Sequence, residues 1–235
     1  MTDEDLLVWC AEIARDLASQ RAEQDVLDRV VELALQFLEG CDDGGVMLLD
    51  RKHGLHTAAL TSERVRESDE AQVELREGPC FDAALGKVPW EEQVYRSEDL
   101  ASETRWPAYA PRARELGFAS MLGFQLFYTE EHFGALNLYS NTRNTFDLRS
   151  QRKGWVLASH AAVALNSART EDQLRTAMET RQEIGQAMGR LMERYQLSSE
   201  MAFAALKRAS QNTNVKLAEV ARTVVRTGVL PGAEK

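Results

Sequence analysis

A long helical pattern without proline is the feature that most constrains how this chain can fold. Apolar residues recur at helical spacing from Asp147 to about Arg194, over roughly forty residues. This exceeds a usual globular helix, so the pattern predicts a connecting helix that pairs with a helix of a second chain. We expect its first turns to pack on the preceding domain, and the part beyond Ala168 to dimerise. Its apolar positions are Trp155, Val156, Ala158, Ala161, Ala162, Leu165, Leu174, Ala177, Met178, Ile184, Ala187, Met188 and Leu191.

The sign of the charge reverses near the end of the chain. The whole protein has 28 Lys and Arg against 37 Asp and Glu, a net charge of −9. Between Arg175 and Arg226 there are 9 basic and 5 acidic residues, which leaves 19 against 32 for the remainder. The last quarter is therefore about +4 and the rest about −13. This reversal predicts a separate module with an anionic partner.

Length and composition favour a cytoplasmic protein with one full domain and one smaller domain. The chain has 235 residues, and 44% of them are hydrophobic, which is enough for two cores. It begins with acidic residues instead of a basic leader, and no run of 18 apolar residues follows, so we expect no membrane partner. Cys10, Cys41 and Cys80 are odd in number and widely spaced, as expected for reduced thiols.

Residues 1–150 predict an α+β domain with a largely antiparallel sheet and flanking helices. Two helices are expected between Leu6 and Glu39, where apolar residues have helical spacing. Two strand hairpins are expected, because apolar and branched runs are separated by short polar links. The expected strands are 46–49, 55–60, 89–94, 120–128 and 133–139, and the further helices are 65–75, a short helix in EGPCFDAA (77–84), and 105–118, with Pro107 in its first turn and Gly117 at its C-cap.

Residues 181–235 predict a module of three helices, joined to the first domain by a coiled-coil helix over 151–180. Ser198 and Asn214 are expected to cap the starts of its second and third helices, and Gly228 is expected to end the third. Gly189 inside the first helix predicts a close approach of two helices. The apolar stripes are Ala202, Phe203, Leu206 and Ala209, and then Leu217, Val220, Ala221, Val224 and Val225.

Small, apolar and polar residues recur in one pattern across the three expected helices. The pattern is Ile184-x-x-Ala187-Met188-Gly189-x-Leu191-Met192-x-Arg194, then Ala202-Phe203-x-x-Leu206-x-x-x-Ser210-Gln211-x-x-Asn214-x-Lys216-Leu217-x-x-Val220-Ala221. With this pattern, the segment resembles the ANTAR family of RNA-binding antitermination modules over about 175–228. The resemblance implies binding of paired RNA hairpins near a transcription terminator. Met188 stands where the family usually has lysine, so no RNA contact is assigned to it.

The preceding region contains the segments EGPCFDAA, RWPAYAPRARELGF and FGALNLYS before a final helix. In these segments it resembles the GAF sensory domain that stands ahead of ANTAR modules in actinobacterial regulators. It implies the fold and a sensory role, but it leaves the ligand unknown. The Asn-Lys-x-Phe-Asp-Glu set of some cyclic-nucleotide-binding GAF domains is absent, and so is a phosphoacceptor receiver domain.

The expected RNA surface combines phosphate-binding cations with side chains that read bases in exposed loops. Each residue also has a structural alternative: Ser210 can pack at a helix end, Asn214 can cap, and the arginines can simply be solvated. A target with two hairpins requires two modules, which favours a homodimer. We assign Arg208, Lys216, Arg222 and Arg226 to phosphates, and Ser210, Gln211 and Asn214 to bases or loops.

The first domain contains no constellation that predicts an enzyme. No phosphate loop, nucleophile elbow or catalytic carboxylate pair is present. His53 and His56 lack a third ligand in the neighbouring sequence, so we predict no metal site and leave any cofactor unknown. For a small-molecule signal, the candidate pocket residues are Cys80, Trp106, Tyr109 and Phe124. Packing in the core is the alternative for all four.

Two other function classes remain open at this stage. A DNA-binding helix-turn-helix regulator would also have a basic three-helix end, although its third helix would carry more exposed polar side chains than LAEVARTVV. A dimeric sensor or scaffold would use the same helices to bind protein alone. Binding of hairpin RNA, duplex DNA or neither distinguishes the three.

Overall fold

The chain forms two compact units, which we call the N-terminal unit (Met1–Arg169) and the C-terminal unit (Thr170–Lys235). The computed structural model describes residues 3–50, 54–84, 94–129 and 132–232. Helix α6 (Leu148–Tyr195) begins in the first unit and ends in the second. The predicted long helix is therefore confirmed. Among the described residues, no helix combines the length and the apolar character needed to cross a membrane.

The N-terminal unit is built on a five-stranded antiparallel sheet with the order β2-β1-β5-β4-β3. Both predicted hairpins are confirmed, and β5 pairs with β1 to join them into one sheet. Most of the strand expected at 89–94 falls outside the described residues. The strands are β1 (Asp43–Asp50), β2 (Gly54–Leu60), β3 (Val94–Ser97), β4 (Ser120–Thr129) and β5 (His132–Ser140).

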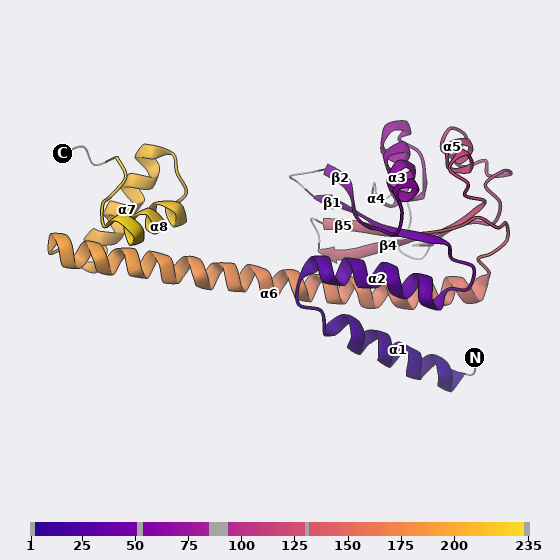
Figure 1. Ribbon diagram of the computed structural model, residues 1–235, viewed down its shortest axis with the longest axis horizontal. Helices are drawn as coiled ribbons and strands as arrows, with labels where there is room; N and C mark the ends of the chain where they lie inside the picture. The colour runs from indigo at the N-terminus through magenta and orange to yellow at the C-terminus, as the bar shows by residue number, and fades with distance from the viewer. Residues whose placement is uncertain (1–2, 51–53, 85–93, 130–131, 233–235) are drawn as a thin grey trace. The chain divides into compact units, whose positions relative to one another are not determined.

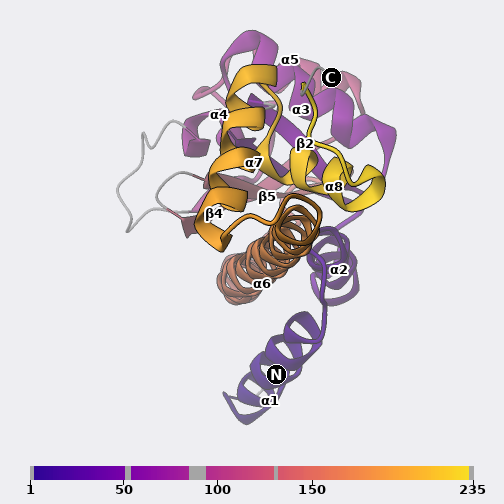
Figure 2. The same ribbon diagram turned by 90° about the vertical axis from the view of Figure 1, so that its left-hand side faces the viewer.

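One face of the sheet is covered by α2 (Glu23–Phe37) and the first part of α6, which lie side by side (Figures 1 and 2). Helix α1 (Asp3–Ala18) packs on α2, and Ile13 and Leu17 join the same buried cluster. Gly154 allows α6 to approach the sheet closely, because a Cβ built there would lie 2.3 Å from the Phe124 ring. This core is mainly aliphatic.

The opposite face carries α3 (Glu63–Leu75), α4 (Pro79–Ala84) and α5 (Tyr109–Glu115) (Figure 1). Its core is rich in aromatic side chains, and Phe118 stacks on Tyr139 with ring centroids 4.3 Å apart. Pro107 lies in the turn before α5 and not in its first turn as expected. Gly117 follows the C-cap with a φ of +92°, which glycine adopts at little cost.

The C-terminal unit packs the end of α6 against α7 (Ser199–Thr213) and α8 (Leu217–Thr227). Ser198 caps α7 as predicted, because its Oγ accepts a hydrogen bond from the backbone N–H of Met201. The core contains only alanine, leucine and valine at its fully buried positions. They are Ala187, Leu191, Ala202, Leu206, Ala209, Val220, Ala221 and Val224.

Three expectations about this unit were wrong. Asn214 does not cap the start of α8, since it is the left-handed C-cap of α7 (φ 53°), and Lys216 holds the N-cap position of α8. Gly189 marks no close helix approach, because a Cβ there would meet no atom of this chain within 4 Å. Phe203 is exposed and lies outside the core, since it falls at the edge of the stripe formed by Ala202, Leu206 and Ala209.

Candidate nucleic-acid interface and candidate ligand pocket

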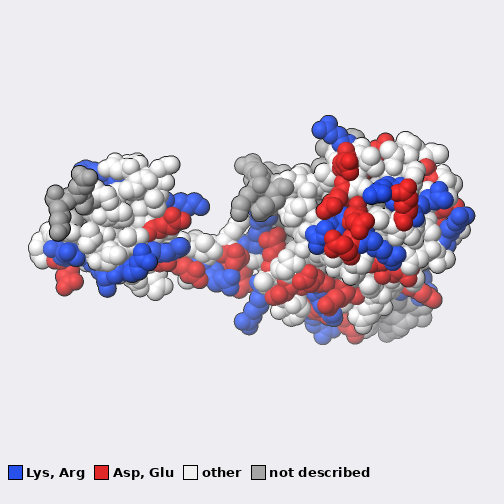
Figure 3. Space-filling view, turned by 45° about the horizontal axis from the view of Figure 1, so that its top comes forward, with Lys and Arg blue, Asp and Glu red and all other residues white. Residues whose placement is uncertain are grey.

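Exposed basic side chains follow α7 and α8 in the C-terminal unit. Lys207 and Arg208 lie on α7, Lys216 begins α8 and Arg226 lies in its last turn. None of these four side chains has a hydrogen bond or ion pair with another residue that the structure describes. Figure 3 shows blue atoms in a band along one border of this unit, while blue and red alternate over the N-terminal unit. These cations are available to phosphate groups.

Arg222, which the sequence assigned to phosphate, is engaged within the unit. Its Nε donates to both carboxylate oxygens of Glu183, at 2.9 and 2.8 Å, and so ties α8 to α6. Arg194 also has a structural contact, because its Nη1 donates to the carbonyl of Gly228 at 3.2 Å. The negative charge of Glu183 offsets the positive charge of Arg222, so Arg222 is less available to an anionic partner than Arg208 or Lys216 is.

Of the three residues predicted to read bases at the turn between α7 and α8, one is engaged in the turn itself and two are exposed. The Ser210 hydroxyl donates to the Val215 carbonyl at 2.6 Å, and the Val215 N–H donates back to the Ser210 carbonyl at 3.2 Å. Ser210 therefore shapes the turn, as its structural alternative stated. Gln211 and Asn214 are exposed on the outer side of the same turn. Their amide groups can reach a ligand.

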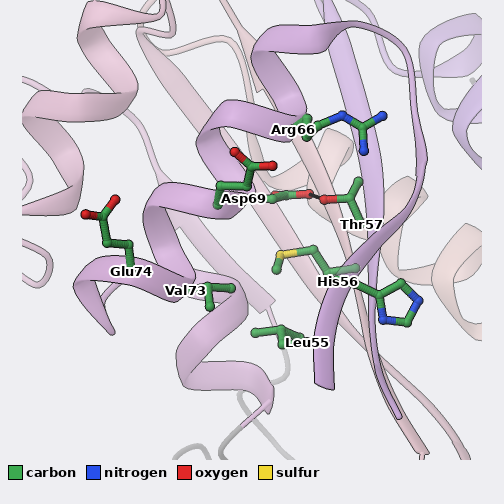
Figure 4. Close-up of a pocket in the computed structure, with 9 residues that line it drawn as sticks. Leu55, His56, Thr57, Arg66, Asp69, Val73 and Glu74 are labelled. Atoms are coloured by element: carbon green, nitrogen blue, oxygen red, sulfur yellow. Dashed lines mark hydrogen bonds between the residues drawn. The ribbon is translucent and has the colours of Figure 1, made fainter. Parts of the chain in front are cut away.

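A pocket of about 440 Å³ lies in the N-terminal unit between α3 and β2 (Figure 4). Thr57 on β2 and Asp69 on α3 are hydrogen-bonded to each other in its lining, and Leu55 and Val73 contribute apolar surface. The lining thus combines three apolar side chains with a larger number of polar and charged ones, which can orient a polar ligand. The lining residues are Met47, Leu55, His56, Thr57, Arg66, Asp69, Glu70, Val73 and Glu74.

Asp69 is a buried carboxylate at the floor of this pocket. Only 1% of its surface is exposed, and the structure gives it no ion pair with another described residue. Hydroxyl groups of Thr57 and Tyr139 donate to it at 2.9 and 3.3 Å, and the Asn137 amide donates at 3.2 Å. Burial raises the pKa of Asp69 to about 7, against the opposing effect of these donors. The side chain therefore exchanges its proton near neutral pH.

The four residues expected to line a pocket lie elsewhere in the fold. Phe124 belongs to the opposite face of the sheet, where its ring contacts α6 at Gly154. Trp106 is buried and its Nε1 donates to Asp82 at 2.9 Å. Cys80 and Tyr109 lie behind the pocket. The Cys80 thiol donates a hydrogen bond to the Asn137 side-chain oxygen, and the Tyr109 hydroxyl is hydrogen-bonded to the Ser68 hydroxyl at 2.7 Å. Burial raises the pKa of the Cys80 thiol, which makes it a poor nucleophile.

Sequence reasoning missed Asp69, although α3 carries a signal. The buried side of α3 is formed by Val65, Ser68, Asp69, Ala71 and Gln72, so polar residues occupy positions where a core helix normally places apolar ones. Such a polar inner face indicates a buried hydrogen-bond network. The other acidic residues of this helix face solvent, however, so the sequence spacing alone does not distinguish Asp69 from them.

No group of three or more metal-ligating side chains that could hold an ion occurs among the described residues. His53 lies outside them. The described cysteines Cys10, Cys41 and Cys80 are free thiols.

Comparison with protein families matches both units. The model of the GAF domain matches residues 20–166, and the model of the ANTAR domain matches residues 172–225. The GAF match spans more than half of the chain, which belongs to this family. The protein is a GAF-ANTAR regulator, in which a sensory domain precedes an RNA-binding antitermination module. Both domains are regulatory and not catalytic, which is consistent with a non-enzyme. Its assignment to the actinobacterial type stays a prediction.

Solved structures share the fold of the sensory domain. The GAF domain of a phosphoenolpyruvate-protein phosphotransferase from Coxiella burnetii is 18% identical with a TM-score of 0.52, over 74% of this chain and 99% of that one. The Acinetobacter counterpart is 18% identical with a TM-score of 0.51, over 72% and 97%. A bacteriophytochrome from R. palustris is 10% identical with a TM-score of 0.62, over 81% and 43%. A search of curated proteins finds no match.

Proposed function

We propose that this protein binds paired RNA hairpins through its ANTAR module and so prevents a terminator from forming, under control of its GAF domain. The single observation that carries the proposal is the set of four exposed cations, Lys207, Arg208, Lys216 and Arg226, that the module leaves without protein partners among its described residues. Lys207, Arg208 and Lys216 lie within seven residues of the exposed amides of Gln211 and Asn214 in the sequence, and Arg226 lies at the other end of α8. Cations hold phosphates, and amides can read the edges of unpaired bases.

The test uses the full-length protein and a pool of RNAs that carry two hairpins with randomised loops. We expect the protein to enrich particular loops, and the selected RNA to bind more weakly as salt increases. Replacing Arg208 and Lys216 with alanine should weaken binding and reduce the slope of log K against log salt by about 2, or somewhat less if the contacts are to unpaired strands.

The matched control replaces Arg112 and Arg114, two exposed arginines of α5 in the sensory domain, with alanine. This variant has the same change in net charge and should keep the wild-type slope. Equal slopes for all three proteins would show that the RNA surface lies elsewhere. Equal binding of duplex DNA would favour a helix-turn-helix regulator, and a protein that enriches no RNA would favour the sensor or scaffold.

A homodimer is part of the proposal, because two hairpins require two modules. Helix α6 exposes large apolar side chains in both units: Trp155 and Val163 lie eight residues apart in the first, and Leu174 and Met178 lie four apart in the second. At about 3.6 residues per turn these intervals are about 2.2 and about 1.1 turns, so the members of each pair lie within about 80° of each other around the helix. Exposed apolar surface of this kind is typical of helices that associate.

Sedimentation tests the dimer. The wild-type protein should sediment as a dimer, and replacing Leu174 and Met178 with glutamate should shift it toward the monomer. Arg175→Glu on the same helix is the control, since Arg175 is exposed and pairs with Asp172 on its own helix. A wild-type protein that is strictly monomeric, with and without RNA, would contradict this part of the proposal.

The control of RNA binding is assigned to a small-molecule signal in the sensory domain, with the pocket between α3 and β2 as its site. Cys80 and Tyr109 support the floor of the pocket from behind through their hydrogen bonds with Asn137 and Ser68. Trp106 and Phe124 pack in the two cores of the domain. Metabolite mixtures can be screened for ligands that raise the melting temperature of the wild-type protein but not of Thr57→Trp, which fills the pocket. Equal shifts for both proteins would place the ligand elsewhere.

A further inference from the structure

The ANTAR module leaves its aromatic side chains out of its core. Between residues 170 and 232, Tyr195 and Phe203 are the only aromatic residues. Tyr195 is 46% exposed and Phe203 is 41% exposed. Neither belongs to the buried cluster or to the partly buried residues packed against it. The core is completed entirely by aliphatic side chains.

This arrangement is costly for so small a unit. Domains of about 60 residues bury a smaller fraction of their surface than larger domains do, and large aromatic side chains normally provide much of that burial. The module instead fills its centre with residues such as Ala187, Ala202 and Ala221 and leaves the Phe203 ring in contact with water. A single exposed aromatic side chain is common on protein surfaces, so the chemistry of its neighbours decides whether it is a binding group.

The neighbours of Phe203 on α7 define the chemistry of this surface. Lys207 and Gln211 follow at intervals of four residues, so Phe203, Lys207 and Gln211 lie along one side of the helix. All three are exposed, and the side leads toward Asn214 in the left-handed turn. An aromatic ring, a cation and an amide therefore occur in succession along about two turns.

Each of these groups matches one part of a single-stranded nucleotide. An aromatic face stacks on a nucleobase, a lysine neutralises the adjacent phosphate, and an amide can hydrogen-bond to a base edge. A protein partner would match the ring equally well, but the uncompensated positive charge of Lys207 and Arg208 on the same helix favours an anionic partner. The surface thus fits an unpaired loop nucleotide better than an apolar protein helix.

We propose that Phe203 is a stacking platform for one unpaired base in the hairpin loop, with Lys207 on the phosphate next to that base. This inference rests on the proposed RNA-binding function and adds a base-stacking residue to it. Stacking requires a flat π-surface, so the aromatic character of residue 203 matters more than its size or hydrophobicity.

The test compares Phe203→Leu, Phe203→Tyr and Phe203→Trp in the full-length protein, with the two-hairpin RNA that the wild-type protein selects from the randomised pool. Leucine should lower the affinity between about 5-fold and 100-fold, since a stacked base contributes a factor of this order. Tyrosine and tryptophan should keep it within about threefold, because their rings stack equally well. The salt dependence should stay unchanged in Phe203→Leu but decrease in Lys207→Ala.

Met201→Ala is the matched control, because Met201 is apolar, 58% exposed and two residues away, which places it on another side of α7. It should bind like the wild type. A second measurement removes loop bases one at a time by abasic substitution. At one position the loss should be large for the wild type and small for Phe203→Leu.

Three results would overturn the proposal. Phe203→Leu could bind RNA as tightly as the wild type, which would leave the proposed function intact and remove only the stacking role. Equal losses for the leucine, tyrosine and tryptophan variants would indicate a shape effect in place of stacking. A Phe203→Leu protein that sediments as a monomer while the wild type is a dimer would make Phe203 a dimer contact. If the wild-type protein enriches no RNA, the proposed function fails first.

Discussion

The two units of this protein use aromatic and polar side chains in opposite ways. The sensory domain buries Trp106, Tyr109 and Tyr139, and it keeps a hydrogen-bond network around Asp69 inside the fold. The ANTAR module has an aliphatic core and leaves Tyr195 and Phe203 outside, near its basic residues. A domain that binds a small molecule places its chemistry within, whereas a module that binds a macromolecule presents its chemistry on the surface.

The largest effect should come from the core of the module. Leu206→Ala removes a fully buried side chain and should lower the free energy of unfolding by about 2 to 5 kcal/mol. In so small a unit this should unfold the module while the sensory domain stays folded. Thermal unfolding followed by circular dichroism should show a separate early transition. Phe203→Ala on the same helix is the comparison, and an equal loss from that variant would break the contrast between core and surface.

The buried network of the sensory domain should make its stability depend on pH. The pKa of Asp69 is about 7 in the folded protein against an ordinary value of 3.8, so the folded state holds a proton that the unfolded state releases. Below pH 4 both states are protonated and the stabilisation is complete. Between about pH 4 and pH 7 the free energy of unfolding should fall by a few kcal/mol at most, and above pH 7 this contribution is lost.

Urea unfolding of the sensory domain at several pH values measures this effect, with Asp69→Asn as the comparison. Asparagine cannot ionise, so the variant should show a smaller decline over the same range even if it is less stable at every pH. Glu103 has the opposite sign, because its pKa is lowered to about 2 and its stabilisation is lost in acid. Measurements above pH 4.5 exclude most of that contribution. Parallel curves for both proteins would mean that Asp69 is ionised throughout.

The packing of α6 on the sheet should tolerate no side chain at Gly154. Gly154→Ala places a methyl group 2.3 Å from the Phe124 ring and should destabilise the sensory domain by about 1 to 3 kcal/mol, despite the better helix propensity of alanine. Gly189→Ala in the module is the internal control, since a Cβ there meets nothing within 4 Å and should stabilise α6 slightly. Melting temperatures should therefore move in opposite directions for the two substitutions.

The smallest effect concerns the start of α7. Ser198→Ala removes the cap on the Met201 N–H and should cost about 1 kcal/mol. Ser198→Asp should retain most of the stability, because a carboxylate also caps and favours the helix N-terminus. Hydrogen exchange of the first turn of α7 should report the loss. Unchanged exchange in Ser198→Ala would show that the core alone holds the helix start.

The sequence by itself determined the elements and their order. The apolar runs and short polar links of the two hairpins, the cap at Ser198 and the uninterrupted pattern of α6 are local features, so they can be recognised without tertiary information. The charge reversal likewise located the basic module. The four cations expected to meet phosphate, Arg208, Lys216, Arg222 and Arg226, are all exposed, although Arg222 is paired with Glu183.

Tertiary structure alone decided which groups are engaged and which are available. Arg222 and Arg208 look alike in sequence, but only Arg222 meets a carboxylate from a helix 39 residues away. Phe203 fits the apolar stripe of α7 by spacing, yet the neighbouring helices cover Ala202 and Leu206 and leave it uncovered. In the sequence Asp69 resembles the solvent-exposed acidic residues of α3, but in the fold side chains from β2 and β5 enclose it. Burial and pairing arise between segments that are distant in the chain, and a local pattern carries no information about them.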